Sequence, residues 1–175
     1  LHVRLTAFFT LITGIIFLLL TTICLLFAES SIKQSNHASF LTNLNAVILY
    51  LQEQGNISHQ WLSQIQHRED FKLYLYDNAV PLSYQSYHVD ETEHALVKEA
   101  IQQARDNYDM DIFMPSSEHI STHTEFTFRA FDGKEYETSA GIIPNQNGYL
   151  SFIVLSSHAG LRHQLRILRL AVIAA

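Results

Sequence analysis

The sequence predicts an α+β protein in which a long N-terminal transmembrane helix continues into a small domain with an antiparallel sheet. Residues 5–28 contain no charged side chain, and as a helix they are long enough to cross a hydrocarbon core of about 30 Å. Residues 29–54 keep the helical pattern but place apolar residues on one face only. In residues 126–155, stretches of strand-like sequence are separated by two turn signals, which is typical of antiparallel strands.

The charge and cysteine content of this domain exclude some classes of partner and site. All 17 acidic residues lie between Glu29 and Glu137, where they outnumber the basic ones. Such a domain repels phosphate backbones, so we expect no nucleic-acid partner. The single cysteine, Cys24, lies in the apolar segment, so the polar domain has neither a disulfide framework nor a cysteine-based metal site.

The N-terminal apolar segment is predicted to be a retained membrane helix and not a cleaved signal. His2 and Arg4 would supply the basic start of a signal peptide, and residues 27–30 a weak cleavage site. The segment is longer than the roughly 7–15 apolar residues of such signals, however. With Arg4 on one flank and Glu29 on the other, the positive-inside rule places residues 1–4 in the cytoplasm and the chain from Glu29 outside.

The first helix is expected to run from about Thr6 to Gln54 and to be followed by a short second helix after Ser58. The apolar residues on the inner face of the first helix recur at steps of three and four: Phe40, Leu44, Val47, Ile48 and Leu51. The second helix would carry Trp61, Leu62 and Ile65. Residues 71–76 alternate as a strand, and Asp77-Asn78 turns the chain into a short return strand over residues 79–84.

A third helix and three further strands complete the predicted order. The spacing of Asp90-Glu-Thr-Glu93 resembles a capping box, and it opens a helix before a loop over residues 107–117. The expected inward residues of that helix are Ala95, Leu96, Ala100, Ile101 and Ala104. The strand around Phe126 and Phe128 meets its partner, residues 135–143, at the Asp132-Gly133 turn, and residues 149–155 form the last strand.

The chain is therefore divided into a cytoplasmic start (1–4), a first transmembrane helix (5–28), an extracytoplasmic domain (29–160) and the start of a second transmembrane helix (161–175). Leu161, Leu165 and Leu168 recur at helical spacing, but the final apolar run is too short to span a bilayer. Together with the initial Leu1, this indicates a fragment or a trimmed chain.

Two segments carry a resemblance to a known family. Phe126-Thr-Phe-Arg-Ala-Phe-Asp-Gly-Lys-Glu-Tyr136 and Gly148-Tyr-Leu-Ser-Phe-Ile-Val154 look like half of a PAS-like (PDC or Cache) sensor sheet. Residues 161–170 are similar to the amphipathic beginning of a second membrane helix. The whole plan resembles the N-terminal sensing portion of a bacterial two-component sensor histidine kinase.

The resemblance implies a signal-transduction role in the bacterial cell membrane. A homodimer would relay an extracellular stimulus to a cytoplasmic kinase, a transferase domain that lies outside this sequence. ATP and the response regulator would meet only that kinase domain, so no cofactor and no catalytic residue are assigned to this chain. Two alternatives stay open: the sensor region of a chemoreceptor or cyclic-dinucleotide enzyme, and a membrane-tethered outer-surface binding protein.

Histidines and carboxylates form two candidate metal-binding groups. His88 and His94 flank a run of acidic residues at the third helix, while His119 and His123 follow Glu118. Imidazole with carboxylate suits zinc or nickel, although a solvated surface is the commoner role of such residues. The same histidines are candidates for pH sensing, because imidazole titrates near neutral pH.

Aromatic residues form a candidate small-molecule site. This set could line a pocket on one face of the sheet, although core packing is the commoner use: Tyr74, Tyr76, Tyr84, Tyr87, Phe126 and Phe128. Arg129 lies on the strand face opposite to the inward phenylalanines and could pair with a ligand carboxylate, or serve as a cross-strand surface charge.

Overall fold

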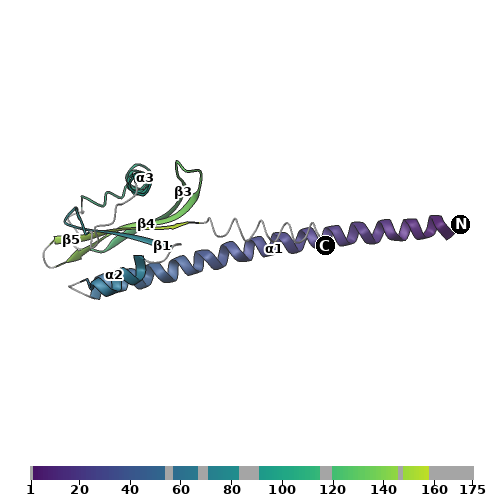
Figure 1. Ribbon diagram of the computed structural model, residues 1–175, viewed down its shortest axis with the longest axis horizontal. Coiled ribbons are helices and arrows are strands. Elements are labelled where there is room, and N and C mark those ends of the chain that lie inside the picture. The colour runs from purple at the N-terminus through teal and green to yellow at the C-terminus, as the bar shows by residue number, and fades with distance from the viewer. Residues whose placement is uncertain are drawn as a thin grey trace. The chain divides into compact units, whose positions relative to one another are not determined.

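The computed structural model confirms an α+β chain with a long N-terminal apolar helix and a small antiparallel sheet (Figure 1). It describes residues 2–53, 57–66, 71–82, 91–114, 120–145 and 148–157. The elements are, in order, α1 (His2–Glu53), α2 (His59–Gln66), β1 (Phe71–Asp77), β2 (Val80–Pro81), α3 (Glu91–Tyr108), β3 (Thr122–Arg129), β4 (Glu135–Asn145) and β5 (Gly148–Ser157). The second transmembrane helix expected over residues 161–175 lies outside the described residues.

The chain forms two compact units, and α1 contributes to both. One unit contains α1 as far as His37, and the other is Ala38–Gly160. The first part of α1 is long and apolar enough to cross a membrane, and none of its most apolar stretch is buried within the protein. Four threonines in this part, Thr10, Thr13, Thr21 and Thr22, each donate a hydroxyl hydrogen bond to the carbonyl four residues earlier, at 2.8–2.9 Å. Their hydroxyls are thereby satisfied within the helix, as a lipid environment requires.

The sheet has the strand order β2-β1-β5-β4-β3, and every neighbouring pair is antiparallel. β1 lies against the last strand, with Tyr76 opposite Ser151 and Leu73 opposite Val154. The predicted Asp132-Gly133 turn joins β3 to β4. Gly133 adopts a φ of 74°, which glycine accepts without strain, and its N–H donates to the carbonyl of Ala130 at 2.8 Å.

Helices cover both faces of the sheet, so the domain has three layers (Figure 1). α3 packs on one face, where its buried residues are Leu96, Val97, Ala100 and Ala104. α1 and α2 pack on the other face, where all five predicted inner residues of α1 are buried with Leu62: Phe40, Leu44, Val47, Ile48 and Leu51. Because the central strands are covered on both sides, β4 and β5 are buried almost continuously.

Three predicted details differ from the structure. Ala95 is exposed, and Val97 takes the buried place beside Leu96. Both residues flank Leu96 on the helix, and the orientation of α3 on the sheet decides between them. α3 also continues to Tyr108, into the stretch expected to be a loop. β2 covers Val80–Pro81 and not Ala79, which has a φ of 66° in the turn; Leu82 N–H still donates to the Leu75 carbonyl at 2.9 Å, and residues 83–84 of the predicted strand lie outside the described residues.

Candidate functional site

The face of the sheet beneath α3 gathers four of the predicted ligand-binding residues. Tyr74 and Tyr76 come from β1, and Phe126 and Phe128 from β3, at alternate positions that point to the same side. The two phenylalanines are only 6% and 7% exposed and lie with ring centroids 6.1 Å apart. They are core residues, so the partly exposed tyrosines are the members of this set that a ligand could reach. Tyr84 and Tyr87 lie outside the described residues.

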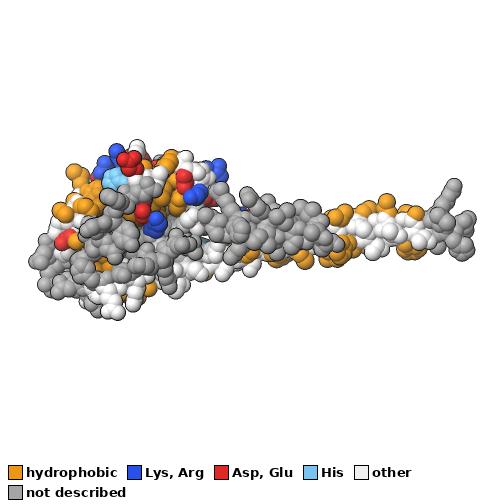
Figure 2. Space-filling model, viewed as in Figure 1, with side chains coloured by type: hydrophobic (Ala, Val, Ile, Leu, Met, Phe, Trp, Pro, Cys, Tyr) orange, Lys and Arg blue, Asp and Glu red, His pale blue; other side chains and the backbone are white. Residues whose placement is uncertain are grey.

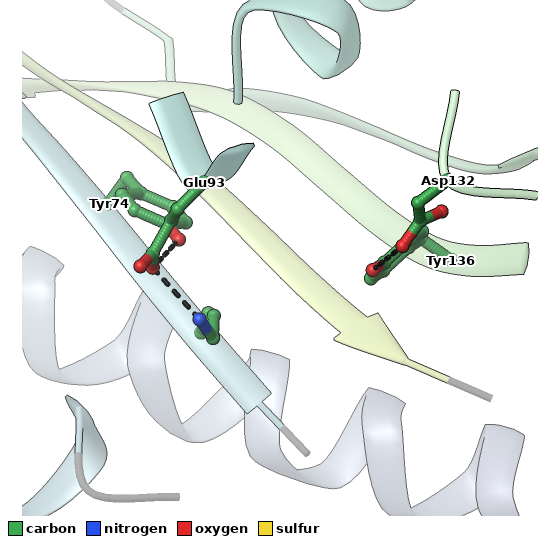
Figure 3. A network of polar contacts seen from close by, with 5 residues as sticks. Tyr74, Glu93, Asp132 and Tyr136 are labelled. Atoms are coloured by element: carbon green, nitrogen blue, oxygen red, sulfur yellow. Dashed lines mark hydrogen bonds and ion pairs between the residues drawn. The ribbon is translucent and has the colours of Figure 1, made fainter. Parts of the chain in front are cut away.

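Tyr74 belongs to a polar contact that joins β1 to the first turn of α3 (Figure 3). Its hydroxyl donates a short hydrogen bond to the Glu93 carboxylate. The same carboxylate oxygen accepts a hydrogen bond from Lys72 Nζ at 3.0 Å. Glu93 also lies in the first turn of a helix, where a negative charge is favoured by the helix dipole. One carboxylate thus fixes both a phenol and an ammonium group at the start of α3.

The surroundings of Tyr74 keep its phenol protonated. Burial raises the pKa of Tyr74 far above its ordinary value, and the hydrogen bond to Glu93 and the negative charge of that residue raise it further. Burial also raises the pKa of Tyr76. Both phenols therefore stay protonated at physiological pH, and Tyr74 donates its hydroxyl hydrogen to Glu93.

A second phenol–carboxylate pair lies at the β3–β4 turn (Figure 3). The Tyr136 hydroxyl donates to Asp132 Oδ2 at 2.9 Å. Burial, together with this hydrogen bond and the adjacent negative charge, raises the pKa of Tyr136 to about 12. Burial alone would raise the pKa of Asp132, but hydrogen bonds from Lys134 and Tyr136 and the positive charge of Lys134 together lower it.

A third cluster surrounds Ser151 at the end of β1. Tyr76 and Ile142 lie on either side of Ser151 in the sheet register. Phe113 approaches Tyr76 edge-on, with ring centroids 5.2 Å apart, and its carbonyl accepts a hydrogen bond from the Tyr149 hydroxyl at 2.9 Å. The loop after α3 is thereby tied to the same face of the sheet as Tyr76.

Buried hydroxyls are the feature of this domain that sequence reasoning missed. Thr138, Ser139 and Ser151 are 0% exposed, and their hydroxyls have no hydrogen-bond partner within the described chain. By strand alternation, Thr138 and Ser151 face α3, and Ser139 faces α1. The available signal was the presence of small polar residues inside otherwise apolar strands. Hydroxyls that are buried without a partner give the α3-facing surface an unused capacity to hydrogen-bond.

The remaining predicted site residues lie apart from the aromatic face. Arg129 is exposed on β3 opposite Glu135, on the side away from α3, as strand alternation predicted. His123 lies on that same side, where it approaches Gly141, whereas His94 is exposed on α3. The two histidines are therefore on opposite sides of the sheet. His88 and His119 lie outside the described residues, and within the described ones no three His, Cys, Asp or Glu side chains gather as metal ligands.

No protein-family model, curated protein or solved structure matches this chain. Its fold and its residues define it only as a three-layer α+β domain that follows an apolar helix. On the α3-facing side of the sheet, the described residues include partly exposed phenols that stay neutral, and buried aromatic rings and hydroxyls behind them. Such groups suit non-covalent recognition of a small molecule by stacking and hydrogen bonding.

Proposed function

We propose that this chain is the membrane-spanning sensing region of a bacterial two-component sensor histidine kinase, with residues 29–160 outside the cytoplasmic membrane. One observation carries the proposal: α1 supplies both an exposed apolar stretch long enough to cross a bilayer and the buried inner face that covers the sheet. An element shared by membrane and domain couples the two, because any repacking of the domain core acts directly on the membrane helix.

The sheet supports the PAS-like part of the proposal. The resemblance concerned the last three strands, and β3, β4 and β5 are antiparallel neighbours in this sheet, with β1 beside β5. In this chain β1 connects the two faces. Its Tyr74 and Tyr76 side chains meet the α3 side, while Phe71, Leu73 and Leu75 pack with α1. A stimulus that shifts β1 from the α3 side would therefore reach α1 through these three apolar residues.

Energetically, the proposal requires two packings of the domain that a stimulus favours unequally. A ligand could reach the partly exposed phenol of Tyr76 in the described packing, whereas the fully buried hydroxyl of Ser151 would gain a partner only in the other packing. Binding there would favour the state in which those hydrogen bonds are made. The output would be a change in autophosphorylation of the downstream kinase domain.

Membrane topology is the first test. In a Cys24→Ser background, Lys134→Cys places a single thiol on the exposed β3–β4 turn. A membrane-impermeant maleimide should label this thiol in intact cells, and the protein should stay in the membrane fraction. Labelling only after lysis, or recovery of the protein from the medium with an N-terminus near Glu29, would contradict the proposal.

Signalling is the second test. Removing residues 30–157 from the full-length protein should abolish the response to stimulus while leaving autophosphorylation measurable. Reading the gene downstream of Ala175 distinguishes the alternatives, since a kinase requires a phosphoacceptor histidine helix and an ATP-binding domain. A chemoreceptor or cyclic-dinucleotide output domain, or a stop codon near this position, would contradict the kinase assignment.

A further inference from the structure

The first turn of α3 differs from the rest of the helix in how it is held on the sheet. None of residues 91–95 is buried, and the first buried side chains of the helix are those of Leu96 and Val97. Apolar packing therefore holds α3 from Leu96 onward and contributes little to the first turn. A polar side chain, the partly exposed Glu93, attaches this turn to β1.

Two side chains of β1 meet the Glu93 carboxylate (Figure 3). The Tyr74 hydroxyl and Lys72 Nζ both donate to its Oε1 atom. Because the acceptor is ionised, such hydrogen bonds are about twice as strong as those between neutral groups. A proton on Glu93 would remove this charge from both contacts. It would also remove the favourable interaction of the carboxylate with the N-terminal end of the helix dipole.

The β1 and β4 groups around this contact keep their protons in acid. Burial raises the pKa of Tyr74, Tyr76 and Tyr136, so all three phenols stay neutral. An ammonium group such as that of Lys72 carries its charge throughout the acid range. The sheet side of the contact is therefore constant in acid, and the charge that changes belongs to Glu93.

The other ionisable groups of the first turn lie on the outer surface of α3. Glu91 and His94 are both exposed, and in Figure 2 blue and red side chains gather on the part of the domain that carries α3. On β5, the residues opposite the two β1 donors are Ile153 and Leu155, which do not titrate. In the described part of the chain, Glu93 is thus the ionisable side chain of this turn that meets β1.

We propose that Glu93 is a pH switch: protonation of its carboxylate releases the first turn of α3 from β1 and lets that turn unwind, while the rest of α3 stays on the sheet. The rest of the helix is held separately. Ala100 and Ala104 are fully buried, and Tyr108 stacks on Phe126 with ring centroids 4.8 Å apart. Acid therefore opens one end of the helix, and the other end remains attached.

The switch acts on the strand that connects the two faces of the sheet. Lys72 and Tyr74 alternate along β1 with Phe71, Leu73 and Leu75, which pack in the core beneath α1. Loss of the bonds to Glu93 frees the α3 side of β1 and so changes what restrains this core. The inference rests on the proposed function for its output, and it names acidification as a stimulus of that sensing region.

Amide hydrogen exchange of the full chain in lipid nanodiscs tests the switch. The amides of residues 95–98 bond to carbonyls of the first turn, so their protection reports its opening once the intrinsic pH dependence of exchange is corrected. Between about pH 7 and pH 4, where a carboxylate takes up its proton, this protection should fall at least about fivefold. Residues 102–108 should keep their protection. An equal loss there would indicate general acid unfolding and overturn the switch.

Matched substitutions identify the group that titrates. Glu93→Gln should show the low protection already at neutral pH and should respond to acid no further. Glu91→Gln and His94→Gln, which change the two exposed groups of the same turn, should keep the wild-type response. Tyr74→Phe removes one of the two bonds and should give intermediate protection at neutral pH.

Two outcomes would overturn the switch: a wild-type pH response in Glu93→Gln, or loss of the response in His94→Gln. Either outcome would leave the proposed function standing, because exchange of these amides depends on neither membrane topology nor kinase output. Recovery of the protein from the medium would instead remove the proposed function and leave the exchange result in force.

Discussion

The domain part of α1 and the helix α3 cover opposite faces of one sheet, and they differ in what they present on either side. Their inner faces are alike, because both bury apolar residues against the central strands. Their outer faces are not, since α3 is charged and α1 carries no formal charge over residues 34–52. Burial thus identifies the faces that build the fold, and the charges on the outer faces distinguish the two helices.

The two sides of the sheet also differ in their titratable groups. The shifted phenols of Tyr74, Tyr76 and Tyr136 all face α3, whereas the core beneath α1 is aliphatic and aromatic. The alkaline titration of these three phenols should therefore act on the α3 side of the sheet.

The largest expected loss of stability comes from a substitution on the inner face of α1. Leu44 is 0% exposed, so Leu44→Ala leaves a cavity against the sheet and should lower the free energy of unfolding by about 3 kcal/mol. Urea titration followed by the fluorescence of Trp61, the single tryptophan, measures this loss. Leu96→Ala on α3 should give a similar loss, and Gln102→Ala on its outer face almost none. A loss below about 1 kcal/mol for Leu44→Ala would mean that α1 does not hold the domain together.

The second prediction concerns Gly141, which lies on the α1 side of β4. A Cβ atom at this position would stand 2.6 Å from His123 Cβ and 2.7 Å from Phe152 Cζ. Gly141→Ala must displace the buried Phe152 ring and should cost about 2 kcal/mol in unfolding free energy. Methyl NMR shifts should appear in the core beneath α1 and be weaker beneath α3. Shifts of equal size on both sides would show that the sheet does not separate the two cores.

The sequence predicted the local structural features of this chain better than the pairing of its distant strands. The inner residues of α1, the β1 alternation and the Asp132-Gly133 turn were predictable, because each depends on neighbours within a few residues. The placement of β1 beside β5 was not, since no local signal specifies which distant strand pairs with it. For the same reason the sequence located Tyr74 and Tyr76 on one face, but not the contact of Tyr74 with Glu93 or the unpaired hydroxyl of Ser151.

Alkaline titration tests the difference in titratable groups between the α3 side and the α1 side of the sheet. The pKa of Tyr136 is about 12 in the folded domain and 10.0 in an unperturbed phenol. Between these values the unfolded chain has lost the proton that the folded chain retains, so stability is complete below pH 10 and falls as the pH rises towards 12. Tyr136→Phe should reduce stability by about 1.5 kcal/mol at pH 7 and flatten this decline. Tyr50→Phe on the α1 side is the control, and an unchanged alkaline slope in Tyr136→Phe would contradict the assignment.

Removal of the Ser151 hydroxyl should increase stability, whereas the substitutions above decrease it. Because this hydroxyl is buried without a partner, Ser151→Ala should raise the free energy of unfolding by about 1 kcal/mol. If the α3 side recognises the stimulus, the same substitution should also weaken the response of the full-length protein. Ser139→Ala, which removes the unpaired hydroxyl on the α1 side, should stabilise without changing the response. Destabilisation by Ser151→Ala would show that this hydroxyl already has a partner.

The smallest effect belongs to the charged outer face of α3. Arg105 forms an ion pair with Asp111 at 2.8 Å, which lowers the pKa of that carboxyl despite an opposing contribution from burial. The arginine is more than half exposed, so Arg105→Ala should cost only about 0.5 kcal/mol, and less in 1 M salt. A substitution of the exposed Asn45, which lies on the uncharged stretch of α1, should instead have an effect on stability that does not depend on salt, because it removes no charge. Equal salt dependence for substitutions on the two helices would show that the difference in charge between their outer faces has no energetic effect.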